Sequence, residues 1–178
     1  METADNNRDF YQRSMYYGTM LGIVWSIMYI LFFTGISSMT GLLACFSLFV
    51  ASPFIAMSFA KKYRKEECND IMNFRKAWIF LFYMYVCAGM FSAFVSFIYL
   101  RFIDNGTFFM SMQEILKAGA ELPGTDEAMK QQIQAALEAL ASITPGNFVW
   151  QLLSNNMFNT SVLPLIIALF VRKNNLNN

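Results

Sequence analysis

The chain has no histidine and only three cysteines among its 178 residues. Without histidine it lacks the commonest metal ligand and the commonest acid–base group. Two cysteines, Cys45 and Cys87, fall in apolar stretches and Cys68 falls in a charged segment, which predicts neither a disulfide framework nor a paired cysteine metal site. The sequence also has no phosphate-binding glycine loop and no nucleophile-elbow serine. We therefore expect no catalytic residue, no metal and no cofactor.

Charge is scarce as well, and none lies in the middle of four long apolar stretches at 16–36, 39–60, 77–100 and 148–171. A helix rises about 1.5 Å per residue, so about 20 apolar residues cross a hydrocarbon layer of about 30 Å. These stretches predict an all-α integral membrane protein with four transmembrane helices in a single domain, 1–178. Because intramembrane charges mark proton relays and ion paths, their scarcity disfavours both functions.

Orientation follows from the lysines and arginines, which favour the cytoplasmic side of short loops. Ten of the thirteen fall in the N-terminal tail, the segment between the second and third spans, and the C-terminal tail: Arg8, Arg13, Lys61, Lys62, Arg64, Lys65, Arg75, Lys76, Arg172 and Lys173. Only Arg101, Lys117 and Lys130 fall on the other side. We expect both termini to be cytoplasmic.

The segment 101–147 is then expected to lie outside the cytoplasm as a helical hairpin. Ser111 and Glu114 have the spacing of a capping box and predict the start of its first helix. A second helix is expected from Thr125, and the run 144–147 is expected to end it. This second helix has an apolar stripe formed by Met129, Ile133, Ala136, Leu137 and Leu140. The first helix, the membrane surface or a partner would cover the stripe.

Small residues recur at four-residue spacing in three spans, which places them on one face of each helix. They are Gly18, Gly22 and Ser26, then Ser52, Ala56 and Ala60, then Ala88, Ser92 and Ser96. Such faces allow helices to approach closely. They predict packing within the bundle or, alternatively, an oligomer interface.

The fourth span contains amides and hydroxyls in its outer half, of which Asn155, Asn156, Asn159 and Thr160 are the candidates for a site. An unpaired amide in hydrocarbon is costly, so these groups must face other helices, water or a ligand. Interhelical hydrogen bonding is one interpretation, and a polar pocket open to the outside is the other.

The segment after the second span holds the densest charge. Lys61, Lys62, Arg64 and Lys65, with Arg75 and Lys76 further on, are candidate contacts for anionic lipid or a partner, although they also set the topology. Three carboxylates in the same segment, Glu66, Glu67 and Asp70, either balance this charge or hold a divalent cation.

Several local features together resemble one known family. These are Tyr17-Gly18 followed by Gly22, the tight turn after the first span, the basic end of the second span, Ile71-x-x-Phe74-x-x-Ala77, and the run 144–148. The chain resembles the small four-helix inner-membrane proteins of Bacteroidetes-type bacteria, a family catalogued only as a domain of unknown function. The polar stretch 155–161 departs from the smoother fourth span of that family. The resemblance supplies no catalytic residues; it implies an accessory role in envelope glycan assembly, beside a membrane glycosyltransferase.

Three functions remain open at this stage. A non-enzymatic accessory subunit that binds a membrane protein partner accounts for the small-residue faces, the apolar outer helix and the basic segment. An oligomeric transporter of lipid or a small solute would use the polar pocket of the fourth span. A membrane enzyme would need a metal on Glu66, Glu67 and Asp70. The lipid bilayer and a protein partner or second copy are the expected partners, and nucleic acid is not.

Overall fold

Four helices of the computed structural model are long and apolar enough to cross a membrane. The structure describes residues 2–123 and 126–173, and it describes side chains over 8–123, 126–156 and 160–173. In this part of the chain the elements are α1 (Glu2–Gly35), α2 (Met39–Glu67), α3 (Phe74–Ile98), the π-helical turn η1 (Tyr99–Ile103), α4 (Thr107–Ala120), α5 (Glu127–Ser142) and α6 (Pro145–Val171). The predicted all-α class with four membrane-length helices is confirmed.

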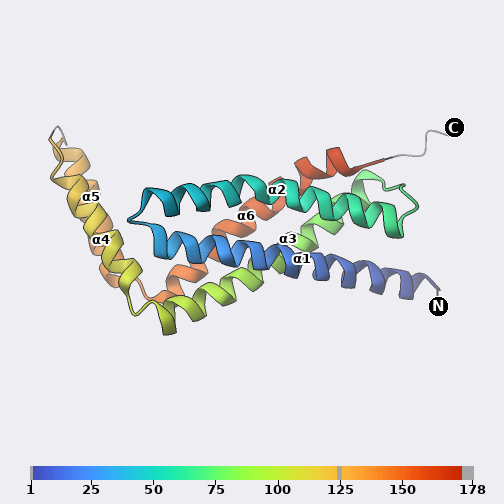
Figure 1. Cartoon of the computed structure of the whole chain (residues 1–178), viewed down its shortest axis with the longest axis horizontal. Coiled ribbons are helices and arrows are strands. Elements are labelled where there is room, and N and C mark those ends of the chain that lie inside the picture. Colours follow the sequence, from blue (N-terminus) through green and yellow to red (C-terminus); the bar gives the residue numbers. More distant parts are fainter. Residues whose placement is uncertain (1, 124–125, 174–178) are drawn as a thin grey trace.

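The membrane-length helices are α1, α2, α3 with η1, and α6, and their ends differ slightly from the predicted spans. The apolar helices run over Arg8–Gly35, Met39–Glu67, Phe74–Ile103 and Pro145–Val171. α2 continues past the apolar stretch into charged turns, where Arg13 of α1 pairs with Glu67 at 2.8 Å. The start of α1 and the end of α6 lie at the same end of the bundle as the α2–α3 connection, as Figure 1 shows.

α1 and α3 make the most extensive contact between helices of the bundle. A Cβ atom on Gly18 would lie 2.7 Å from the carbonyl oxygen of Met84, and one on Gly22 would lie 3.0 Å from Cβ of Phe91. A side chain at Gly18 would collide with the backbone of α3 and push the helices apart, and one at Gly22 would fit only if its neighbours on α3 moved by a few tenths of an ångström. The small residues of α3, including Ala88, are buried against this contact.

A second close approach sits at the α1–α2 turn. A Cβ atom on Gly41 would lie 2.6 Å from Cα of Gly35, so the two helix ends touch through their backbones. The sequence analysis did not find this pair, because Gly35 and Gly41 belong to different helices.

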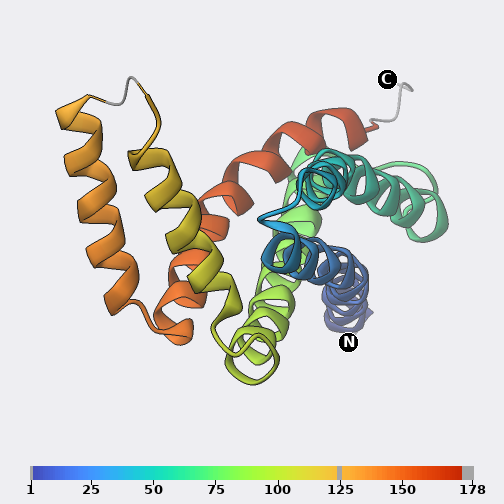
Figure 2. The same cartoon turned by 60° about the vertical axis from the view of Figure 1, so that its left-hand side comes forward.

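The hairpin of α4 and α5 projects sideways from the opposite end of the bundle and stands apart from it in Figure 2. Its base is Phe108, which is fully buried, with its ring 5.0 Å from that of Phe33 and 5.4 Å from that of Phe148. Along α5 no described residue is buried. The hairpin is thus attached to the bundle at one end only.

The predicted start of α4 is wrong, and the run 144–147 has a second role that was not predicted. α4 begins at Thr107 rather than at Ser111, because both carboxylate oxygens of Asp104 accept from the backbone N–H of Phe108 and Gly106 adopts a φ of 85° that reverses the chain. Ser111 lies inside α4. The second helix ends at Ser142, just before the run 144–147 as predicted, but this run also starts α6, where the side chain of Thr144 accepts from the N–H of Asn147. Thr125 lies outside the described residues.

Candidate functional site

The small residues of α2 bring a polar pair from two helices together. Ser52, Ala56 and Ala60 are all buried. The indole Nε1 of Trp25 donates to the hydroxyl of Ser52 at 2.6 Å, which joins α1 to α2 across the middle of the bundle. Ser26 and Ser92, by contrast, donate to carbonyls of their own helices, Gly22 and Gly89. Ser52 is therefore the small polar residue that links helices here.

A second interhelical bond joins α1 to α6. The side-chain amide of Asn156 donates to the hydroxyl of Tyr29 at 2.7 Å. Thr160 is buried, and its hydroxyl donates to the carbonyl of Asn156 in its own helix. Asn155 is exposed, and the side chain of Asn159 lies outside the described residues. Of the predicted polar set, the structure brings Asn156 and Thr160 into the bundle.

These two hydrogen bonds border a cavity of about 420 Å³ at mid-height in the bundle. The described residues that line it come from all four long helices: Trp25, Met28, Tyr29, Phe49, Val50, Ser52, Pro53, Phe54, Tyr85, Asn156, Val162 and Leu163. A smaller cavity of about 160 Å³ is also lined by Tyr85 and Asn156. Both cavities are mainly apolar, and every residue known to line them is uncharged.

Tyr85, like Tyr29, is a lining residue of this region that the sequence analysis missed. Its side chain is only 1 % exposed, its ring packs edge-on against Trp25 at 5.5 Å, and it lines both cavities. Within the described part of the chain its hydroxyl has no hydrogen-bond partner. The sequence did offer one signal for Tyr85, because it places a phenol hydroxyl in the middle of an apolar stretch.

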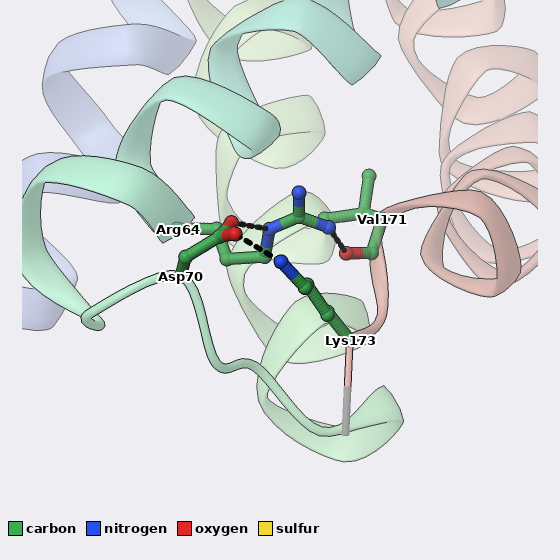
Figure 3. Close-up of polar contacts among 4 residues, drawn as sticks. All are labelled: Arg64, Asp70, Val171 and Lys173. Carbon is green, nitrogen blue, oxygen red and sulfur yellow. Dashed lines mark hydrogen bonds and ion pairs between the residues drawn. The ribbon is translucent and has the colours of Figure 1, made fainter. Parts of the chain in front are cut away.

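The other candidate site lies where the α2–α3 connection meets the end of α6, and we call it the clasp (Arg64, Asp70, Met72, Val171 and Lys173). Figure 3 shows Arg64 between two partners: its Nε donates to Asp70 at 2.9 Å and its Nη1 donates to the carbonyl oxygen of Val171 at 2.5 Å. Lys173 also donates to Asp70. Met72 and Lys173 exchange two backbone hydrogen bonds of 2.9 Å.

The electrostatics of the clasp centre on Asp70. Donation by Lys173 is the main cause that holds the pKa of the Asp70 carboxyl below its ordinary value. The charges of Lys173 and Arg64 act in the same direction, and partial desolvation opposes them. The backbone of Asn69 and Asp70 is left-handed, with φ values of 48° and 60°, a region that asparagine and aspartate tolerate better than most residues.

The predicted basic set is divided among three surroundings. Arg64 belongs to the clasp, whereas Lys61, Lys62 and Lys65 line a shallow depression along α2. Arg75 and Lys76 line a depression together with Phe10 at the start of α3, where the ammonium of Lys76 lies over the Phe10 ring. The carboxylates of the segment pair with cations: Glu66 with Lys62, Glu67 with Arg13, and Asp70 with Arg64 and Lys173.

Together, the helices and the interhelical contacts define an all-α protein with four membrane-length helices. Residues 16–173 match the family described as "Protein of unknown function (DUF4199)", and the chain belongs to that family. Comparison with curated proteins and with solved structures finds no match.

Proposed function

We propose that the protein is a non-enzymatic accessory subunit of the bacterial inner membrane that binds a membrane protein partner. Both termini are cytoplasmic in this proposal, and the hairpin lies outside. The distribution of charge supports the orientation, because ten of the thirteen lysines and arginines belong to the segments at the clasp end.

The hairpin is attached to the bundle at its base alone, and this observation supports the accessory role most strongly. Ile133, Leu137 and Leu140 are half-buried between α5 and α4, so the neighbouring helix covers part of the predicted apolar stripe. Met129 on α5 and Met110 on α4 remain 53 % and 62 % exposed. Exposed methionines suit an adaptable protein contact. The family resemblance adds envelope glycan or lipid-linked assembly as the proposed setting.

Co-purification from native membranes tests this role. The protein, extracted in mild detergent, should elute with a partner protein in fixed ratio. Changing Met110→Gln and Met129→Gln together should reduce that recovery about tenfold, because exposed apolar anchors dominate binding energy. Gln131→Ala on the exposed surface of α5 is the matched control and should leave recovery unchanged. A protein that elutes alone, or a partner retained equally by the methionine variant, contradicts the proposal.

The cavity favours a second candidate function, the binding or transport of a lipid or small solute. A volume of about 420 Å³ lies within the range of small-molecule sites, about 300–1,000 Å³. Replacing Asn155, Asn156 and Asn159 by leucine should abolish transport in reconstituted vesicles. Unchanged flux in that variant contradicts transport through this region.

A further inference from the structure

We propose that the lysine face at the end of α2 binds the headgroup of one anionic phospholipid, while the acyl chains of that lipid lie along the exposed apolar surface of the same helix. This inference goes beyond the proposed function and does not depend on the accessory role or on transport. It requires only that α2 crosses a lipid bilayer.

The first observation is the spacing of the residues that form this face. A depression of about 350 Å³ is lined by Ser58, Lys61, Lys62, Lys65 and Glu66. The serine and the three lysines follow the i, i+3, i+4, i+7 pattern, which places residues on one face of a helix. The opposite face of α2, with Ala56, Ala60 and Tyr63, is buried in the bundle. The lysines therefore point away from the other helices.

The second observation is that most of this positive charge is not neutralised by the protein. Lys61 and Lys65 have no ion-pair partner among the described residues, and Lys62 approaches Glu66 only to 4.0 Å. Arg64, in the same segment, is instead held in the clasp. The depression thus keeps a net positive charge. Lysine ammonium groups donate up to three hydrogen bonds each, which suits the oxygens of a phosphate.

The depth of the lysines along α2 matches the level of lipid headgroups. Lys61 lies about 33 Å along the helix from Met39, the first residue of α2, at a rise of about 1.5 Å per residue. The hydrocarbon layer of a bilayer is about 30 Å thick, so a bilayer that begins at Met39 ends just before Lys61.

The apolar surface that leads to the lysines identifies the ligand as a lipid. Phe46, Val50 and Phe54 are 64 %, 45 % and 60 % exposed, and Ser58 and Lys62 continue their four-residue spacing. Acyl chains that pack along this row bring the phosphate of the same molecule to the lysines. A free phosphate or an acidic protein segment would use the charge but not the adjoining apolar row.

Native mass spectrometry of the full-length protein, titrated with lipid in mild detergent, tests the inference. Phosphatidylglycerol is the anionic probe, and phosphatidylcholine with the same acyl chains is the zwitterionic one. Phosphatidylglycerol should saturate at one tightly bound molecule per chain, with an apparent affinity about tenfold higher than that of phosphatidylcholine. Glycerol phosphate, which carries the charge without acyl chains, should not displace it.

Two double variants of equal charge locate the site. Lys61→Gln with Lys65→Gln should weaken binding of phosphatidylglycerol about tenfold or more, because each basic residue beside a membrane contributes about fivefold to the attraction of anionic lipid. Arg75→Gln with Lys76→Gln, which removes the same charge from the separate depression at the start of α3, is the matched control and should weaken it less than about twofold. Eight of the ten basic residues of this end remain in either variant, so the threading is kept.

Glu66→Gln changes the affinity in the opposite direction. It removes the carboxylate that lines the depression and should strengthen binding of phosphatidylglycerol about two- to fivefold, while binding of phosphatidylcholine stays unchanged. Lysines that only set the topology would give no such gain. This variant also decides the question if the lysine variant proves unstable.

Four results overturn the inference: equal affinity for the two lipids, equal weakening in the two double variants, displacement by glycerol phosphate, or unchanged affinity in Glu66→Gln. The melting temperature without added lipid should be the same in the parent and both double variants, because the substituted side chains lie outside the core. Added phosphatidylglycerol should raise it in the parent and in the control variant but not in the lysine variant. An equal rise in all three also overturns the inference.

Discussion

The two ends of the molecule are built by different means. At the clasp end, side-chain charges and two backbone hydrogen bonds tie the end of α6 to the α2–α3 connection. At the hairpin end, the rings of Phe33, Phe108 and Phe148 meet in an apolar cluster, and the rest of the hairpin extends beyond it. One end is held by several directional contacts, whereas the other is held at a single point. An extended element held at one point has free surface for a partner.

The largest expected effect comes from breaking the attachment of the hairpin. Phe108→Ala should lower the free energy of unfolding by about 3–5 kcal/mol, the usual cost of removing a buried phenylalanine ring. Chemical denaturation in detergent measures it. Phe102→Ala, at a position that is 70 % exposed, is the control and should change stability by less than about 0.5 kcal/mol. Equal effects of the two variants would mean that Phe108 does not anchor the hairpin.

Breaking the clasp should have the next largest effect. Arg64→Ala removes the donor that serves both Asp70 and the carbonyl of Val171, and its side chain is only 12 % exposed. We expect a loss of about 1–3 kcal/mol, since two charged hydrogen bonds are lost and the carbonyl of Val171 loses this donor, whereas Asp70 keeps Lys173. Lys65→Ala, on the exposed surface of α2, should be nearly neutral in the same denaturation assay. A neutral Arg64→Ala would show that the clasp does not contribute to stability.

Acid should weaken the clasp end selectively. Because the pKa of Asp70 is lowered in the folded protein, its carboxylate contributes full stability above the ordinary pKa of aspartate, and this contribution is lost as the pH falls through the lowered value. The melting temperature of the parent should therefore exceed that of Asp70→Asn at neutral pH. The difference should disappear as the pH falls below about 4. A difference that persists unchanged in acid would assign the effect to something other than the charge of Asp70.

The smallest effect is expected on the outer surface of the hairpin. Lys130 pairs with Glu127 at 2.9 Å, and both side chains are largely exposed. Lys130→Ala should cost only about 0.2–0.5 kcal/mol, the usual value of an exposed pair on one helix. Circular dichroism during thermal unfolding measures the change. If Lys130→Ala lowered stability as much as Arg64→Ala does, the pairs on the hairpin would contribute as much as the clasp, and the two ends would not differ in this respect.

Much of the fold could be predicted from sequence because membrane-length apolar stretches have few other structures available to them. The small-residue spacing of α1 indicated the face on which Gly18 and Gly22 approach α3, but the spacing did not identify the partner helix. The start of α4 could not be obtained from Ser111 and Glu114, because a carboxylate outside the helix, Asp104, caps it instead.

The candidate sites were harder to predict because they depend on contacts between distant segments. Asn156 was singled out from its chemistry, but its partner Tyr29 lies 127 residues away. Arg64 was grouped with the neighbouring lysines, yet its partners include the carbonyl of Val171, 107 residues further on. Local patterns identify polar residues that need partners, whereas the fold determines which partners they have.

Hydrogen–deuterium exchange of the protein in lipid nanodiscs tests the contrast between the two ends most directly. Backbone amides of α5 should exchange much faster than those of α3 at its contact with α1, and Met72 and Lys173 should be protected by their mutual hydrogen bonds. In the presence of the co-purifying partner, α5 should become protected while the clasp stays unchanged. Protection of α5 in the isolated protein as strong as that of α3 would contradict the account.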